Sequence, residues 1–345
     1  MTAPEVDRGV PIAITHTPGR SRRLPRAAAL FFLIATAHAS DPLASWRDTD
    51  AKTSIVEYVA KVTDEKSADF VPADERVAVF DNDGTLWPEN PMPFQLAFTL
   101  DELKRRLPGE PEWKNDDAIK AALAGDLPAL LAGNYEGLFR LIELTGSGMT
   151  TVEFADRVRG WLETAKHPRF EKRYDQLAYQ PMLELLAYLR ANGFKTFLVS
   201  GGGSDFMRVF SERVYGIPPE QVVGSNTRVT YELHEDGPVL VKTMSDLFVD
   251  DKAGKPAGIH QFVGRRPVAC FGNSDGDKQM LEYTTLDNPH PSLGLIIHHT
   301  DAEREYVYDK DAESSGKLAA ALEEAPKRGW IVVDMKNDWA DIFAP

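Results

Sequence analysis

The chain has 345 residues, 43% of them hydrophobic and 27% charged, which is the composition of a globular protein with one sizeable core and room for an inserted or appended subdomain. Its formal net charge of -14 argues against nucleic acid as a partner, because binding to a phosphate backbone needs a basic face. The single cysteine, Cys270, lies in an apolar run and is expected to be a buried hydrophobic residue. With only one cysteine, the chain cannot form an intrachain disulfide.

Residues 1–39 have the pattern of a signal peptide with an N-terminal extension. Residues 20–26 include four arginines, residues 27–37 are largely apolar, and Ala37-His38-Ala39 precedes Ser40. This order predicts cleavage after Ala39, and the apolar run is too short to span a bilayer. We therefore expect a periplasmic or secreted protein with no stable membrane span after cleavage. Ser21-Arg22-Arg23 is similar to a twin-arginine signal, but Pro25 follows it, so the export route stays open.

The run Val77-Ala78-Val79-Phe80 predicts a strand buried on both faces of a parallel sheet, and a helix over about residues 45–66 leads into it. Asp81 and Asp83 follow directly, at the strand end where ligands bind in such sheets. Two carboxylates this close repel one another, and a divalent cation between them would keep both ionised. A plain polar turn is the alternative interpretation, since Asn-Asp-Gly is ordinary turn chemistry.

A long helical pattern follows the two acids. Pro88, Pro91 and Pro93 break the chain, and helical spacing then continues to about Tyr179 without a convincing strand. A helical insertion placed directly after such a strand end is typical of a cap that covers a site. We therefore expect a core made of residues 40–90 and 180–345, with a helical cap over residues 91–179.

The rest of the chain alternates between strands and helices. Helices are predicted at residues 181–190, 206–215, 255–263 and 316–324, and strands at 194–199, 267–271, 293–297 and 330–333. Residues 226–242 alternate as a β-hairpin around Glu235-Asp236-Gly237-Pro238. This pattern predicts an α/β protein with a doubly wound, Rossmann-like core, a mainly parallel sheet and a β-hairpin.

Three further features begin where a predicted strand ends or a helix begins. Ser200-Gly201-Gly202-Gly203 would form an anion pocket from its hydroxyl and backbone N–H groups, although a flexible turn explains a lone glycine triplet equally well. Lys255 opens a helix and on its own would be a solvated lysine. Residues 272–277, Gly-Asn-Ser-Asp-Gly-Asp, offer oxygen ligands for a hard cation, or form another turn.

Taken in this order, the four features resemble the motifs of phosphatases in the haloacid dehalogenase superfamily. Asp81, Asp83, Gly84 and Thr85 match the D-x-D-G-T signature, while the serine, lysine and acidic-loop motifs are weaker but fall in the right sequence. The resemblance covers roughly residues 76–281, and the helical insertion takes the position of that superfamily's cap. Within the superfamily, the Ser-Gly-Gly segment and the cap position look most like the phosphoserine phosphatase branch.

The resemblance implies a mechanism with named roles. Asp81 would be the nucleophile that takes the phosphoryl group, and Asp83 would protonate the leaving alcohol and later activate water. Mg²⁺ would be held by Asp81, the Asp83 backbone carbonyl, Asn273 and Asp277. Thr85, Ser200, Gly201 and Lys255 would hold the phosphate oxygens.

Several positions depart from the family pattern or stay open. Asn273 stands where the family commonly has aspartate, so the site loses a charge there, and Asp275 is the alternative ligand. Lys252 is a rival for Lys255.

Glu89, Gln95 and Arg304 are candidate substrate contacts; Glu89 lies one position short of the place where phosphoserine phosphatases carry a glutamate for the substrate amine. His299 is a further candidate, because adjacent histidines on a strand face opposite ways.

The sequence therefore predicts an exported, Mg²⁺-dependent phosphomonoesterase that acts on a small phosphorylated metabolite. A phosphate-ester binding or sensing protein with little turnover is one alternative, favoured only by Asn273. A phosphotransferase that passes the phosphoryl group to an alcohol is another. The leaving group, the pH optimum and the oligomeric state are not specified by the sequence.

Overall fold

A seven-stranded, mostly parallel sheet forms the centre of the computed structural model, which describes residues 41–312 and 314–344. The strand order is β3-β2-β1-β6-β7-β8, with β9 on β7, and only β8 is antiparallel to its neighbour. The strands are β1 (Val77–Phe80), β2 (Lys195–Gly203), β3 (Val222–Ser225), β6 (Ala269–Gly272), β7 (Leu293–Thr300), β8 (Val307–Tyr308) and β9 (Ile331–Asp334). A separate antiparallel pair, β4 (Val229–His234) and β5 (Gly237–Lys242), forms the predicted hairpin.

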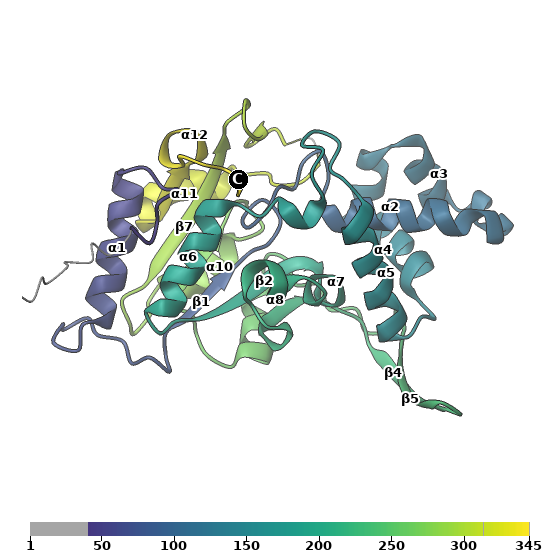
Figure 1. Cartoon of the computed structure of the whole chain (residues 1–345), viewed down its shortest axis with the longest axis horizontal. Helices are drawn as coiled ribbons and strands as arrows, with labels where there is room; N and C mark the ends of the chain where they lie inside the picture. Colours follow the sequence, from purple (N-terminus) through teal and green to yellow (C-terminus); the bar gives the residue numbers. More distant parts are fainter. Residues whose placement is uncertain (1–40, 313, 345) are drawn as a thin grey trace, which may run out of the picture. The chain divides into compact units, whose positions relative to one another are not determined.

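Helices cover both faces of this sheet (Figure 1). The α-helices are α1 (Asp50–Thr63), α2 (Phe94–Arg106), α3 (Asp117–Ala124), α4 (Leu127–Gly146), α5 (Thr151–Thr164), α6 (Gln180–Ala191), α7 (Ser204–Arg208), α8 (Ser211–Tyr215), α9 (Gly254–Gly258), α10 (Lys278–Thr285), α11 (Ala320–Arg328) and α12 (Met335–Asp338). Short 3₁₀ segments lie at Leu107–Gly109, Pro111–Asn115, Tyr174–Gln176 and Pro219–Gln221, and a π-helical turn at Ile259–Val263 continues α9.

Alternate residues of β1 enter two different hydrophobic clusters. Ala78 and Phe80 pack with α1 and α6, whereas Val77 and Val79 pack with the turn after α9 and with α10. Because successive side chains of a strand point to opposite faces, a strand covered on both sides must be apolar throughout. This explains why the four residues of β1 are all buried.

The predicted fold class is confirmed, with differences at several boundaries. Residues 200–203 continue β2 instead of forming a turn, because β3 pairs with them as far as Gly203. The single helix expected over residues 206–215 is divided into α7 and α8. Residues 91–179 contain α2 to α5, as the helical pattern indicates, while their role as a cap stays a prediction.

The signal peptide predicted for residues 1–39 lies outside the described residues, and the fold described here is that of the unit formed by residues 40–345. Across the described ranges, none of the helices has both the length and the apolar character needed to cross a membrane.

Candidate active site

The loop after β1 is fixed against the loop after β6. The Asp81 backbone N–H donates to the Phe271 carbonyl (2.9 Å), so the two loops leave the sheet side by side. Gly84 has a φ of +74°, and a Cβ at this position would overlap Asn273 Nδ2 and Glu89 Oε1. Glycine is therefore required at this turn, both for its backbone conformation and for the close approach of these two side chains.

Asp83 lies on the same loop and is held through one of its oxygens. The Trp87 indole N–H donates to Asp83 Oδ1 (2.8 Å), and Trp87 is itself buried against Phe94 and Phe210. Burial raises the pKa of Asp83, and the Trp87 hydrogen bond opposes this shift only in part. A positioned carboxyl group that tends to keep its proton is suited to donate it to a leaving group.

Lys255 is buried between two carboxylates. Its ammonium group lies 2.6 Å from Asp81 Oδ1 and 2.6 Å from Asp277 Oδ1, and its side chain is only 2% exposed. The rival, Lys252, is exposed and has a positive φ of 53° in the turn before α9. The structure therefore brings Lys255, and not Lys252, into contact with Asp81.

The positive charge near Asp81 does not fully offset its burial and the negative charge of Asp277. Burial raises the pKa of Asp81 to about 8, the charge of Asp277 adds to this shift, and Lys255 opposes it. Burial by itself would lower the pKa of Lys255, but Asp277 and Asp81 outweigh that effect and keep the lysine protonated. A further cation near Asp81 would lower this pKa and favour the ionised carboxylate.

Ser200 and the glycines after it form one side of the pocket. The Gly202 N–H donates to Ser200 Oγ (3.2 Å), and the Gly203 N–H donates to Gln95 Oε1 (2.7 Å). Ser200 and Gly201 line the same cavity as Asp81, and their part in holding phosphate stays a prediction. Gln95, a candidate substrate contact, also lines it, and its carbonyl oxygen holds the end of β2 in place.

The loop after β6 is organised by Asp277. Its Oδ2 accepts hydrogen bonds from the N–H groups of Asn273 (2.9 Å) and Ser274 (3.0 Å), while its Oδ1 contacts Lys255. Both oxygens are therefore engaged and Asp277 holds Lys255 in place, while the predicted part of Asp277 in metal ligation stays a prediction. Asp275 is also engaged: its Oδ1 accepts from the N–H groups of Ala319 and Ala321 at the start of α11.

Thr85 and Asn273 meet behind the pocket. The Thr85 hydroxyl is fully buried and donates to Asn273 Oδ1 (3.1 Å). Neither Thr85 nor Asn273 is among the residues that line the cavity, and their contact ties the nucleophile loop to the loop after β6, so a direct role of Thr85 in holding phosphate stays a prediction. Glu89 accepts from Asn273 Nδ2 (2.6 Å) and from the Tyr308 hydroxyl (2.9 Å) at the same oxygen, Oε1.

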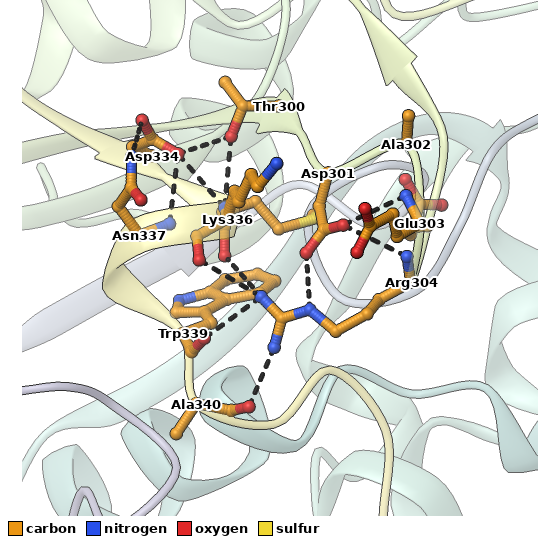
Figure 2. A network of polar contacts seen from close by, with 12 residues as sticks. Thr300, Asp301, Ala302, Glu303, Arg304, Asp334, Lys336, Asn337, Trp339 and Ala340 are labelled. Atoms are coloured by element: carbon orange, nitrogen blue, oxygen red, sulfur yellow. Dashed lines mark hydrogen bonds and ion pairs between the residues drawn. The ribbon is translucent and has the colours of Figure 1, made fainter.

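Arg304 is not among the residues that line the cavity, and Figure 2 shows its contacts. Its guanidinium group donates to the carboxylate of Asp301 and to the backbone carbonyl groups of Ala340 (2.7 Å) and Trp339 (3.1 Å). These bonds tie the segment after β7 to the C-terminal segment. We therefore withdraw Arg304 as a substrate contact, because its donors are already engaged away from the cavity.

Sequence reasoning missed Tyr308, Tyr215 and the structural role of His299. His299 Nε2 lies 2.7 Å from the carbonyl oxygen of Gly84, and the imidazole stacks on the Tyr308 ring. The Tyr215 hydroxyl donates to Asn82 Oδ1 (3.1 Å). These side chains support the nucleophile loop from distant segments, and only the predicted alternation of the two histidines gave a signal for any of them.

A cavity of ≈ 580 Å³ lies over these groups. Its polar residues include Asp81, Asp83, Ser200, Gly201 and Lys255. Its apolar wall is formed largely by the helical insertion and α7, with Leu96, Leu138, Phe139, Ile142, Phe154 and Phe206. The cavity therefore joins a charged end, suited to a phosphate, to an apolar end that would contact a leaving group.

A family model described as haloacid dehalogenase-like hydrolase matches residues 78–282, more than half of the chain. The chain belongs to this family. The match confirms the superfamily that the four motifs predict, and it identifies this haloacid dehalogenase-like protein as a hydrolase. None of the curated proteins compared with it shows a significant match.

Three solved structures illustrate what this haloacid dehalogenase-like protein is similar to. A conserved protein of unknown function from Anaerococcus prevotii shares 16% identity, with 77% of this chain and 90% of that chain covered and a TM-score of 0.47. A protein of unknown function from Bordetella pertussis shares 18% identity, with 76% and 99% covered and a TM-score of 0.46. A phosphoserine phosphohydrolase-like protein from Francisella tularensis shares 16% identity, with 73% and 98% covered and a TM-score of 0.39.

The donor set fits the divalent cation that this family implies. Asp81 and Asp83 bring carboxylate oxygen atoms to the cavity, and Asn273 lies on the adjoining loop after β6; Mg²⁺ prefers oxygen ligands of these kinds. The Lys255 ammonium group contacts Asp81 and Asp277, and Asp83 and Glu89 line the cavity with Asp81, so the ionised site has an excess of negative charge. Within the described residues, no group of three or more His, Cys, Asp and Glu side chains has the arrangement of a metal site.

Proposed function

We propose that this chain is a Mg²⁺-dependent phosphomonoesterase that forms an aspartyl phosphate on Asp81. The observation that carries the proposal is the contact of buried Lys255 with Asp81, at the charged end of a cavity that Asp83 also lines. A binding site alone needs no carboxylate nucleophile beside a second carboxyl group that tends to keep its proton. Bound Mg²⁺ would neutralise charge on the phosphate and on Asp81.

In the first step, an oxygen of the Asp81 carboxylate attacks phosphorus and the bond from phosphorus to the leaving oxygen breaks. Asp83 transfers its proton to that oxygen, so the alcohol leaves neutral. Lys255 lies against Asp81 Oδ1, where its charge would stabilise the negative charge on the equatorial phosphate oxygens. Ser200 and Gly201 line the same end of the cavity and would orient the phosphate.

In the second step, Asp83, now a carboxylate, takes a proton from water as the water oxygen attacks phosphorus. The bond between phosphorus and Asp81 breaks, which releases inorganic phosphate and restores both carboxyl groups. The Trp87 hydrogen bond keeps Asp83 in one orientation during both steps. The same group therefore acts as acid and then as base without moving far.

The apolar wall indicates the class of leaving group. Leu138, Phe139 and Ile142 of α4 face the cavity together with Phe154 and Phe206. Burying an aryl or alkyl group against them would stabilise the complex by roughly 25 cal/mol per Å² of apolar surface. Glu89, whose oxygen Oε1 already accepts from Asn273 and Tyr308, is poorly placed to receive a substrate amine. We therefore propose esters of apolar alcohols or phenols over phosphoserine.

We also propose that the protein acts outside the cytoplasm, on the support of the basic and apolar pattern in residues 20–39. Phosphate esters cross membranes poorly, so an exported phosphatase would release phosphate and an alcohol that can be taken up. Cell fractionation of the native host with an antibody to this chain tests this. Recovery of the chain only in the cytoplasm, with residues 1–39 still attached, would contradict export.

The activity is tested by Mg²⁺-dependent hydrolysis of p-nitrophenyl phosphate by the full chain and by Asp81→Asn. We expect Asp81→Asn to lose at least about 10³-fold in kcat, because the nucleophile is removed while the shape is kept. Asp117→Asn, an exposed aspartate of α3, is the matched control and should keep its rate. Equal activity of Asp81→Asn and the parent chain would refute the mechanism.

The two alternatives give different results in the same assay. A binding or sensing protein would bind p-nitrophenyl phosphate in the presence of Mg²⁺ without releasing p-nitrophenol. A phosphotransferase would release p-nitrophenol and, with glycerol added, form glycerol phosphate in place of part of the inorganic phosphate. A phosphomonoesterase is expected to release phenol and inorganic phosphate in equal amounts.

A further inference from the structure

Lys242 brings a positive charge to the apolar wall of the cavity. It is the last residue of β5, it lines the cavity, and its side chain is 14% exposed. Its ammonium group lies over the ring of Phe154, 4.6 Å from the ring centroid, and Phe154 belongs to the apolar wall. A cation enclosed in this way is costly unless nearby groups or a ligand compensate its charge.

Backbone contacts hold Lys242 at this position. Its N–H donates to the Met149 carbonyl (2.8 Å), and its carbonyl accepts from the Gly148 N–H (3.0 Å), in the segment between α4 and α5. Val241 pairs with Thr150, directly before α5. The end of the hairpin therefore lies against the entrance to α5 (Figure 1), and the Lys242 side chain reaches the cavity from a fixed backbone.

Asp205 is the ion-pair partner of Lys242, but it compensates the charge only in part. Asp205 Oδ2 accepts from the Lys242 ammonium group, and Asp205 Oδ1 lies 3.7 Å from Arg208 Nη1. One negative charge is thus shared by two positive charges. An ammonium group has three N–H donors, and among the described residues Asp205 is the one hydrogen-bond acceptor of Lys242 Nζ. The apolar end therefore keeps positive charge and donors that a ligand can use.

The other lysines of the cavity belong to its charged end. Lys255 contacts Asp81. The backbones of Lys252 and Lys317 are hydrogen-bonded to the loop after β6. Lys242 is the cavity lysine that contacts the apolar wall, so a group bound there would be recognised apart from the phosphate.

We propose that Lys242 recognises a carboxylate at the far end of the leaving group. The preferred substrate is then a phosphate ester of an apolar alcohol or phenol that also carries a carboxylate. The ester phosphate would lie beside Lys255, and the apolar part would lie against Phe154 and its neighbours. A carboxylate has the single negative charge that this end lacks, whereas Asp205 would repel a second phosphate, which carries up to about two negative charges. The inference rests on the proposed phosphatase function.

The test compares p-carboxyphenyl phosphate with p-carbamoylphenyl phosphate, which has a similar shape and no charge on its leaving group. The p-(carboxyethyl)phenyl ester and its amide give a second, longer distance from the phosphate. Release of inorganic phosphate is measured with the full chain and Mg²⁺. We expect kcat/KM to be at least about ten-fold higher for the carboxylate than for the amide at one of the two lengths, the usual value of a hydrogen bond to a charged group. A ratio near one at both lengths would overturn the proposal.

Two variants separate recognition from a structural role, because both break the same ion pair. Lys242→Met keeps the apolar stem and removes the charge, while Asp205 retains Arg208. We expect its carboxylate-to-amide ratio to fall at least about ten-fold, mostly through KM, while the rate with the amide stays within about three-fold of the parent. Asp205→Asn removes the competing carboxylate, so the same ratio should rise about two- to five-fold, the value of a partly exposed ion pair.

A purely structural ion pair predicts a different result. It would change the rates with both esters equally in the two variants, and that outcome would overturn the proposal. If Lys242→Met does not fold, the direction of the change in Asp205→Asn decides. Lys120→Met, which breaks an exposed ion pair with Asp117 outside the cavity, is the matched control and should leave the ratio unchanged.

The result is distinguishable from a failure of the proposed function. If the parent chain hydrolyses both members of each pair equally, only the role of Lys242 is overturned. If it hydrolyses none of the esters, the phosphatase proposal fails, and titration calorimetry with the same esters still decides whether Lys242 discriminates in favour of the carboxylate. A chain that binds none of them overturns both proposals.

Discussion

Single residues in this protein differ in how their buried charges are compensated. Lys255 contacts two carboxylates and is almost fully enclosed. Asp250, also fully buried, has no hydrogen-bond partner at either carboxylate oxygen within the described residues. Burial raises the pKa of Asp250 to about 7, with the charge of Lys255 opposing this shift. Buried Lys255 is therefore stabilised in its charged form, whereas buried Asp250 is stabilised in its protonated, neutral form.

This difference predicts a pH dependence of stability. The pKa of Asp250 is raised from 3.8 to about 7, so the folded chain retains a proton that the unfolded chain releases. The contribution of Asp250 to the free energy of unfolding therefore falls as the pH rises from about 4 to about 7. Asp250→Asn removes this pH-dependent contribution. In urea unfolding without Mg²⁺, the free energy of unfolding of the variant minus that of the parent should therefore increase by roughly 2 kcal/mol between about pH 5 and pH 8. A difference that is the same at both pH values would contradict this account.

At the scale of elements, the site depends on where the strands end and on which helix face lines the cavity. The sequence indicated the first point, because a run such as Val77–Phe80, apolar throughout, marks a strand covered on both faces, and Asp81 follows it. It did not indicate the second. The spacing of Leu138 and Ile142 on α4 predicts an apolar face, but the same spacing would suit a face packed in the core. Only the structure shows that this face lines a cavity.

The wall of α4 gives a prediction about specificity. Phe139→Ala removes an aromatic side chain from the apolar end and leaves the charged end untouched. We expect kcat/KM for p-nitrophenyl phosphate to fall by about ten-fold, mostly through KM, since roughly 1–2 kcal/mol of apolar contact is lost. For glycerol phosphate, which has little apolar surface, the change should be less than about two-fold by the same estimate. Equal losses for both substrates would show that Phe139 does not contact the leaving group.

At the scale of the whole molecule, the contacts that sequence reasoning missed join segments far apart in the chain. Asn273 and Glu89 are 184 positions apart, and Tyr308 and Glu89 are 219 apart. Local periodicity carries no information about such pairs. Lys255 was predicted because it begins a helix, a local feature, and because it falls in the motif order of the family that the sequence resembles. Arg304 was misplaced because its carbonyl partners, near Ala340, belong to a segment whose path no local pattern specifies.

The excess negative charge of the site predicts that Mg²⁺ stabilises the whole fold. A ligand that binds only the folded chain stabilises it by about 2.7 kcal/mol at a concentration of about 100 times Kd. We expect Tm to rise by several degrees when MgCl₂ is added and to fall back when EDTA is added. NaCl at the same ionic strength is the control, because general screening would act without a specific site. An equal rise in Tm with NaCl would contradict specific binding.

Identification of the residue that carries the phosphoryl group tests the central claim most directly. The full chain would be mixed with Mg²⁺ and p-nitrophenyl phosphate and quenched with borohydride, which reduces an acyl phosphate to an alcohol, before peptide mass spectrometry. Conversion of Asp81 to homoserine is predicted, and more of it in Asp83→Asn, where water is no longer activated. Modification at a different residue, or no modification in a chain that is turning over, would contradict the account.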